Sequence, residues 1–309
     1  MKNLILIGLF IPCLLNSCNV STSKQAGHQD KPGVTGNFGE TINNTILHYW
    51  DNLNVSDTAT LFKKEVGEQQ LVDYLYLLNK TSADSAHDGL ITLLDKMLTN
   101  QALFDHFIGI IEKYLNHPDS PLRNEEQYIS VLEYCIKDER LDARYKIRPQ
   151  YQLSMLYKNR LGHAAEDFNY ITPSANKGSL YKIDAPLTLL LFYDPDCENC
   201  REIIRQLSNS KMLKAMQHKK ELQVLAIYTA DNLGLWKDYA SLIPAEWING
   251  SDKQQIHKQK KYDLRAFPTF YLLDKDKKVL LKDAYMDVVM DTLSTIVNKK
   301  MVNQRSRSM

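Results

Sequence analysis

Apolar residues recur at helical spacing through the first half of the chain. They stand three or four residues apart, so that each set lines one face of a helix. The sets are Ile42, Ile46, Trp50 and Leu53; Leu71, Leu75 and Leu78; Leu90, Leu94 and Leu98; Phe104, Phe107, Ile111 and Leu115; Tyr128, Leu132, Cys135 and Ile136. Polar or turn-forming residues interrupt the pattern at 54–57, 82–88, 100 and 117–121. The sequence therefore predicts an all-α domain over residues 41–162, a bundle of about six helices with short connections.

Near Gly162 the helical spacing gives way to short continuous apolar runs. Leu187–Tyr193 is too short for a helix and indicates a strand buried on both faces, as in parallel sheets. Leu222–Tyr228 is a second such run, and the helical sequence between them completes a right-handed βαβ unit. Residues 270–274 and 279–281 predict an antiparallel pair, followed by a helix. We expect an α/β domain over residues 163–302, with a mixed sheet flanked by helices, and a tail at 303–309.

The first 18 residues differ from the rest of the chain. Lys2 precedes an apolar run over residues 4–15, which is too short to span a bilayer but typical of a signal peptide. Leu15-Asn16-Ser17-Cys18 resembles the lipobox of bacterial lipoproteins. That resemblance implies a leader over residues 1–17, cleavage before Cys18 and a lipid anchor on its thiol. A plain secretory signal and an uncleaved anchor are the alternatives.

A polar segment follows Cys18, rich in Ser, Gln, Lys and Gly. Its composition predicts a flexible tether over residues 18–40. In the Bacteroidetes an acidic run after the lipidated cysteine tends to accompany surface export, and no such run is present here. We therefore expect a lipid-anchored protein of the cell envelope that faces the periplasm, on either the inner or the outer membrane.

Composition and cysteine count narrow the function further. A net charge of +1 provides no strong field for nucleic acid, so we expect no nucleic-acid partner. Of five cysteines, Cys13 leaves with the leader and Cys18 carries lipid, so Cys135, Cys197 and Cys200 remain. One close pair and one odd cysteine do not form a disulfide-stapled scaffold. Cys135 lies on an apolar helix face and is expected to be a buried structural thiol.

The close pair is the motif Cys197-Glu198-Asn199-Cys200, between a predicted buried strand and a helix. Cysteines three positions apart in a first helical turn can close a small disulfide ring. The free N–H groups and positive end of the helix stabilise a thiolate on the first cysteine. Cys197 is therefore the expected nucleophile and Cys200 the resolving thiol.

The order of elements carries a family resemblance. A strand, the CxxC at a helix start, a second strand and then Phe267-Pro268-Thr269 entering a third strand resemble the thioredoxin superfamily. More narrowly, residues 164–301 are similar to TlpA/ResA-type thiol-disulfide oxidoreductases. The resemblance implies a cis peptide at Pro268 that faces the CxxC and leaves the Phe267 backbone free to bind substrate.

The same resemblance implies partners and cofactors. Substrates would be protein thiols or disulfides, reduced with electrons from an unidentified donor. No cofactor would be needed beyond the redox-active Cys197–Cys200 disulfide. The helical region resembles uncharacterised domains that precede thioredoxin folds in Bacteroidetes lipoproteins, and its partner is unknown.

Three positions depart from the family pattern. Asp196 stands where thioredoxins often carry Trp, Leu191 where thioredoxin has a buried acid, and Ile203 where ResA-type proteins often carry an acid. The residue that helps proton transfer to the resolving thiol is therefore unassigned. Asp194 and Glu202 are the remaining candidates.

Acidic residues surround the expected nucleophile. Asp194, Asp196 and Glu198 place like charge beside Cys197, which disfavours a thiolate and opposes the helix terminus. These residues, with Glu202, are the expected modulators of thiol ionisation. The sequence thus predicts a reducing couple suited to the reduction of substrate disulfides.

Two other classes of function compete with this interpretation. A zinc site on Cys197 and Cys200 would need two more ligands, and the chain has no second CxxC and no CxxH. The histidines show no metal-ligand spacing, so we expect no metal. The serious alternative is a binding or assembly lipoprotein whose helical domain holds a partner and whose thioredoxin-like fold has no significant redox turnover.

Overall fold

The computed structural model describes residues 38–307, and side chains from 42 to 302. The expected leader, Cys18 with its expected lipid anchor, and nearly all of the expected tether lie outside this range. The last three residues assigned to the tether, 38–40, belong instead to the first helix. None of the described helices is both long enough and apolar enough to cross a membrane.

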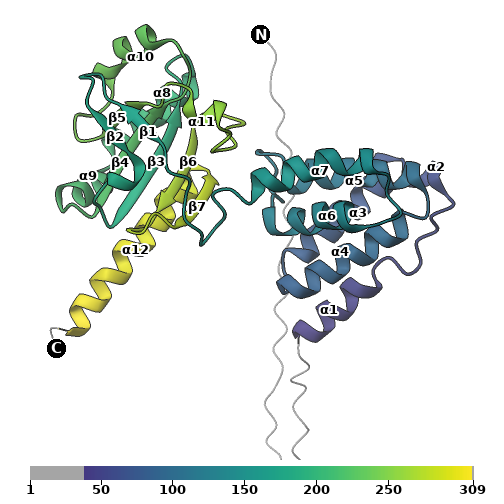
Figure 1. Cartoon of the computed structure of the whole chain (residues 1–309). Helices are drawn as coiled ribbons and strands as arrows, with labels where there is room; N and C mark the ends of the chain where they lie inside the picture. The colour runs from purple at the N-terminus through teal and green to yellow at the C-terminus, as the bar shows by residue number, and fades with distance from the viewer. Residues whose placement is uncertain (1–37, 308–309) are drawn as a thin grey trace, which may run out of the picture. The chain divides into compact units, whose positions relative to one another are not determined.

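The first half of the described chain is helical, as the apolar spacing predicts. Figure 1 shows its helices running alongside one another, and α6 packs against both α4 and α7. The elements are α1 (Phe38–His48), α2 (Thr58–Leu61), a π-helical turn η1 (Lys64–Glu68), α3 (Gln69–Leu78), α4 (Ala83–Met97), α5 (Gln101–Leu115), α6 (Glu125–Lys137) and α7 (Ala143–Leu156). One apolar core, which includes Cys135, holds these helices together.

Side-chain caps decide where the longer helices begin. Ser82, Asn100, Asn124 and Asp142 each accept a first-turn backbone N–H, of α4, α5, α6 and α7 respectively. The prediction that residues 82–88 interrupt the helices is therefore wrong for residues 83–88, which belong to α4. Because Ser82 caps the helix, α4 begins at once at Ala83.

The second half of the chain forms one mixed sheet of seven strands among the described residues. Its elements are β1 (Asn169–Ile171), β2 (Lys177–Ser179), η2 (Leu180–Lys182), β3 (Leu187–Tyr193), α8 (Glu198–Asn209), α9 (Lys211–His218), β4 (Leu222–Tyr228), α10 (Leu233–Tyr239), η3 (Ala240–Leu242), β5 (Ile248–Ser251), α11 (Gln255–Lys258), β6 (Thr269–Leu273), β7 (Val279–Ala284) and α12 (Met286–Arg307). The strand order is β2-β1-β5-β4-β3-β6-β7 (Figure 1). Strand β3 pairs parallel with β4 and antiparallel with β6.

Strand β3 is buried throughout and, apart from Thr188, carries large apolar or aromatic side chains, because the sheet is covered on both faces. Leu189 and Leu191 contribute to the core under α8, α9, α10 and α12. Leu190 and Phe192 contribute to the core on the opposite face, with Tyr262. Alternate residues of a strand point to opposite faces, so two cores require a continuous apolar run.

The structure differs from the sequence expectation in one helix end and in three short strands. Helix α12 continues to Arg307, where a tail at 303–309 was expected. The short strands β1, β2 and β5 were not predicted, because they contain only three or four residues each. Strand β5 also contains Gly250, where a side chain would clash with the ring of Tyr170 at 2.8 Å.

Charged side chains join the segment before α6 to strand β7. Arg123 pairs with Asp283 at 2.8 Å and with Glu125 at 2.9 Å, and Lys282 pairs with Glu125 at 2.7 Å. The exposed fractions of these four side chains lie between 6% and 17%. Burial alone would lower the pKa of Arg123, but the Asp283 and Glu125 carboxylates outweigh it and raise that pKa.

Candidate functional site

The CxxC lies where strand β3 ends and helix α8 begins. A tight turn connects them: the Asp196 N–H donates to the Asp194 carboxylate at 2.9 Å, and the Cys197 N–H donates to the Asp194 carbonyl at 3.1 Å. Cys197 is the N-cap of α8, and its Sγ accepts the Cys200 N–H at 3.2 Å. A sulfur at this position receives helix N–H groups that would stabilise negative charge on it.

The two thiols have different environments. Both are free thiols, Cys197 half-buried and Cys200 fully buried. Burial raises the pKa of Cys200 to about 12, and the Cys197 sulfur beside it acts in the same direction. Cys200 is therefore a protonated thiol at neutral pH, and Cys197 is the more accessible of the two sulfurs.

The segment before strand β6 faces the accessible sulfur. The Phe267–Pro268 peptide bond is cis, as the family resemblance implies. The Cys197 thiol lies 3.6 Å from the Phe267 carbonyl oxygen, to which it can donate. Within the described residues, the Phe267 N–H has no hydrogen-bond partner. The two sequence-predicted parts of the site, 70 residues apart, therefore meet.

The four acidic residues singled out in the sequence occupy different positions. Asp194 lies in the turn and affects Cys200 in two ways: a backbone hydrogen bond lowers the pKa of that thiol, and its carboxylate raises it. Asp196 and Glu198 are exposed. Glu202 is held by Arg205 at 2.6–2.8 Å and by Gln206, and the Arg205 hydrogen bond lowers its pKa to about 2. Of the four, Asp194 is the one whose charge and backbone clearly shift the pKa of the buried Cys200 thiol.

A polar network beneath α8 was not found from the sequence. The Tyr193 hydroxyl and the Trp236 Nε1–H both donate to Asn249 Oδ1, at 2.9 and 3.0 Å. The Asn249 Nδ2 is buried with no partner among the described residues. Tyr193 and Trp236 belong to the same core as Cys200, and Tyr239 packs against it. Burial raises the pKa of Tyr239, Arg201 lowers it and Cys200 raises it, so this phenol lies within electrostatic reach of the Cys200 thiol.

No single sequence signal could have revealed this network. Its members lie on β3, α10 and β5, and their aromatic side chains are expected in any apolar core. Around the CxxC and elsewhere in residues 38–307, no group of three or more His, Cys, Asp or Glu side chains could hold a metal ion.

Comparisons with known proteins agree with this fold. A thioredoxin-like family matches residues 186–279, and a domain of unknown function, DUF5106, matches residues 39–159. A thioredoxin-like protein from Bacteroides caccae, known from a crystal structure, is 36% identical, with a TM-score of 0.80. That match covers 89% of this chain and 99% of the other. The chain belongs to the thioredoxin-like proteins.

Two further structures are similar to parts of this thioredoxin-like protein. The C-terminal domain of an uncharacterised protein from Bacteroides fragilis is 44% identical, with a TM-score of 0.43; the match covers 44% of this chain and 98% of that one. The thioredoxin domain of a thiol-disulfide oxidoreductase from Bacteroides vulgatus is 21% identical, with a TM-score of 0.40 over 45% of this chain and 98% of that one. No curated protein matches the chain.

Proposed function

We propose that this protein is a thiol-disulfide oxidoreductase that reduces disulfides of protein substrates. One observation carries the proposal. Cys197 caps α8 with its sulfur beside the Cys200 N–H, and the same sulfur lies 3.6 Å from the Phe267 carbonyl. An accessible thiol at a helix start, facing a backbone segment with an unpaired N–H, can attack a disulfide and hold the attached chain.

The reaction proceeds in two exchange steps. The Cys197 thiolate attacks one sulfur of the substrate disulfide, forms a mixed disulfide and releases the other sulfur as a thiolate. Cys200 then loses its proton and attacks Cys197 Sγ, which forms the Cys197–Cys200 disulfide and releases the second substrate thiol. Two electrons pass to the substrate, and a dithiol donor must return two electrons to the protein before the next cycle.

The high pKa of Cys200 identifies the demanding step. A thiol with a pKa of about 12 is almost wholly protonated at neutral pH, so a base must take its proton as the mixed disulfide resolves. Asp194 is our proposed base, because it lies in the turn before the CxxC and its carboxylate raises the pKa of Cys200. Its charge beside the pair also supports a reducing couple.

A trapping experiment tests the proposal. Cys200→Ala should accumulate mixed disulfides on Cys197, and mass spectrometry of the cross-linked material from cells would identify the substrates. Wild-type protein should catalyse insulin reduction by dithiothreitol. If wild-type protein shows no catalysis and Cys200→Ala captures nothing, the proposal fails and the binding or assembly hypothesis takes its place.

We further propose that Cys18 carries lipid and holds the protein on the periplasmic side of the cell envelope. The lipobox-like segment before Cys18 supports this. Detergent phase partition of cell extracts is the test. The wild-type protein should enter the detergent phase and Cys18→Ala should not; equal partition of the two would contradict a lipid on this residue.

A further inference from the structure

Two adjoining cavities flank the loop that leads to the cis peptide. The larger, of about 700 Å³, lies between the ends of α5 and α7 and the loop residues Asp263, Arg265 and Ala266. The smaller, of about 460 Å³, is lined by Phe267 and by the ends of β4 and α11. Both are lined by Tyr151 and Met155 of α7 and by Asp263. We call these two cavities together the α7 groove.

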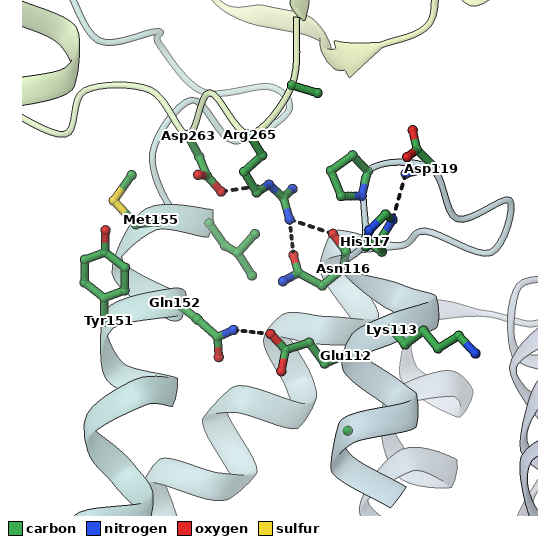
Figure 2. Close-up of a pocket in the computed structure, with 14 residues that line it drawn as sticks. Glu112, Lys113, Asn116, His117, Asp119, Tyr151, Gln152, Met155, Asp263 and Arg265 are labelled. Carbon is green, nitrogen blue, oxygen red and sulfur yellow. Dashed lines mark hydrogen bonds and ion pairs between the residues drawn. The ribbon is translucent and has the colours of Figure 1, made fainter.

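The side chain of Arg265 ties this loop to the end of α5. Arg265 Nη1 donates to the carbonyl of Asn116 at 2.6 Å and to its side-chain oxygen at 3.1 Å, and the guanidinium pairs with Asp263 at 3.1 Å. Figure 2 shows Arg265 and Asp263 projecting from the loop toward Asn116, with Tyr151 and Met155 along the other side of the cavity. These contacts hold the loop without a ligand, and such preorganisation limits the entropy lost on binding.

The loop is also held upstream of this point. Asn159, almost fully buried, donates its Nδ2–H to the Lys261 carbonyl at 2.9 Å. Lys158 donates to the Lys260 carbonyl at 2.6 Å. The segment just after α7 therefore supports the start of the loop, and the end of α5 supports its middle.

The α7 groove begins at the proposed reaction centre. Phe267 lines its smaller cavity and presents its carbonyl 3.6 Å from Cys197 Sγ. An extended polypeptide advances about 3.3–3.6 Å per residue, so residues a few positions from a cysteine bonded to Cys197 can reach the groove. A small disulfide bonded to Cys197 has no chain to place there.

Among the described residues, the charged side chain that remains without an opposite partner at the smaller cavity is positive. Asp263 is paired with Arg265, which leaves His257 and Lys260 as the other titratable lining groups apart from the phenols of Tyr151 and Tyr262. The Lys260 ammonium lies 4.7 Å from the centre of the Tyr151 ring. Of the four lysines in residues 253–261, Lys260 is the one that lines the groove. Its ammonium favours an acidic segment at this end of the groove.

We propose that the α7 groove binds the polypeptide that flanks the substrate cysteine, with a preference for acidic segments. This inference rests on the proposed disulfide chemistry and gives the helical domain a task in it. The domain would favour extended protein segments over small disulfides.

A kinetic comparison tests the groove. Protein that carries Cys200→Ala is mixed with ten-residue peptides, each with one cysteine joined to thionitrobenzoate by a disulfide. When Cys197 attacks the peptide sulfur, thionitrobenzoate is released, and its release measures the rate of attack. One peptide has two glutamates four and five residues from its cysteine, a second has serines there, and 5,5′-dithiobis(2-nitrobenzoate) is the small disulfide. Tyr151→Ala and Lys260→Ala should slow the acidic peptide about tenfold more than the small disulfide.

Tyr145→Ala is the matched control. Tyr145 is another exposed tyrosine of α7, 43% exposed against 50% for Tyr151, and it does not line the groove. This variant should leave both reactions unchanged. Equal slowing of peptide and small disulfide, no slowing, or the same rates for the acidic and serine peptides would overturn the proposal.

Photo-cross-linking gives a second readout without a groove substitution. A benzoylphenylalanine four residues from the peptide cysteine should cross-link to α5, α7 or residues 260–266 once the mixed disulfide has formed. Cross-links confined to other surfaces would overturn the groove. Absence of any mixed disulfide would instead remove the proposed function, and this inference with it.

Discussion

The helical domain and the thioredoxin-like domain both bury a cysteine, but only one gives its cysteines a reactive setting. Cys135 lies in the last turn of α6, 4% exposed, and burial raises its pKa to about 12. Burial raises the pKa of Cys200 to about the same value, yet Cys200 adjoins Cys197 at a helix start. The difference teaches that the place of a thiol on its helix, rather than its burial alone, separates a structural cysteine from the proposed redox centre.

The largest expected effect breaks this comparison directly. Cys197→Ala should lower insulin reduction at least about 1000-fold, because no other accessible thiol faces the substrate loop in the described chain. Cys135→Ala should retain activity close to wild type. Loss of activity in Cys135→Ala, with its circular dichroism unchanged, would show that the helical domain takes part in the chemistry.

Next comes the charged contact between the segment before α6 and strand β7. Arg123→Ala leaves the largely buried Asp283 and Glu125 short of a partner and should lower the free energy of unfolding by about 3 kcal/mol, measured in urea. Arg144→Ala is the control: its side chain is 85% exposed and pairs with Asp142, so the cost should be below about 1 kcal/mol. Similar costs for the two variants would argue that the contact does not join the domains.

From the two buried thiols we expect the free energy of unfolding to depend on pH, with a separable contribution from each region. Folding raises the pKa of Cys135 and of Cys200 from a value near 9 in the unfolded chain to about 12. The contribution of each protonated thiol to the free energy of unfolding is therefore complete below pH 9 and is lost as the pH rises toward about 12. Between pH 9 and 10 each thiol should cost the reduced protein up to about 1.4 kcal/mol. Oxidation to the Cys197–Cys200 disulfide should remove the pH-dependent loss that is due to Cys200. The Cys135→Ala substitution should remove the loss that is due to Cys135. Urea unfolding from pH 8 to 10 measures this, and identical slopes for reduced and oxidised protein would contradict the assignment to Cys200.

The smallest expected effect concerns one helix cap in each region. Asn100 caps α5 by accepting the Leu103 N–H at 3.2 Å, and Ser210 caps α9 by accepting the Leu213 N–H at 3.3 Å. Asn100→Ala and Ser210→Ala should each cost about 1 kcal/mol. If the regions unfold together, both variants shift one common transition in thermal unfolding. Two transitions, each shifted by only one variant, would show that the regions unfold separately.

Local patterns in the sequence predicted much of the fold. The apolar runs of β3 and β4 gave both strands with their observed ends, since strands buried on both faces admit few polar residues. The spacing of apolar residues likewise predicted the bundle. Helix α7 is the weak case: only Met155 and Leu156 are buried along it, so it has little apolar periodicity to detect. Yet α7 forms a wall of the proposed groove.

The sequence by itself determined the CxxC at a helix start, because this motif stands next to recognisable elements, and the family resemblance implied the proline that faces it. Only the tertiary structure joined Tyr193 and Trp236 to Asn249 beneath Cys200, and Arg265 to Asn116 across 149 positions. Each of these contacts depends on single polar side chains far apart in the chain. Such residues interrupt no local pattern, so only the folded chain reveals that they meet.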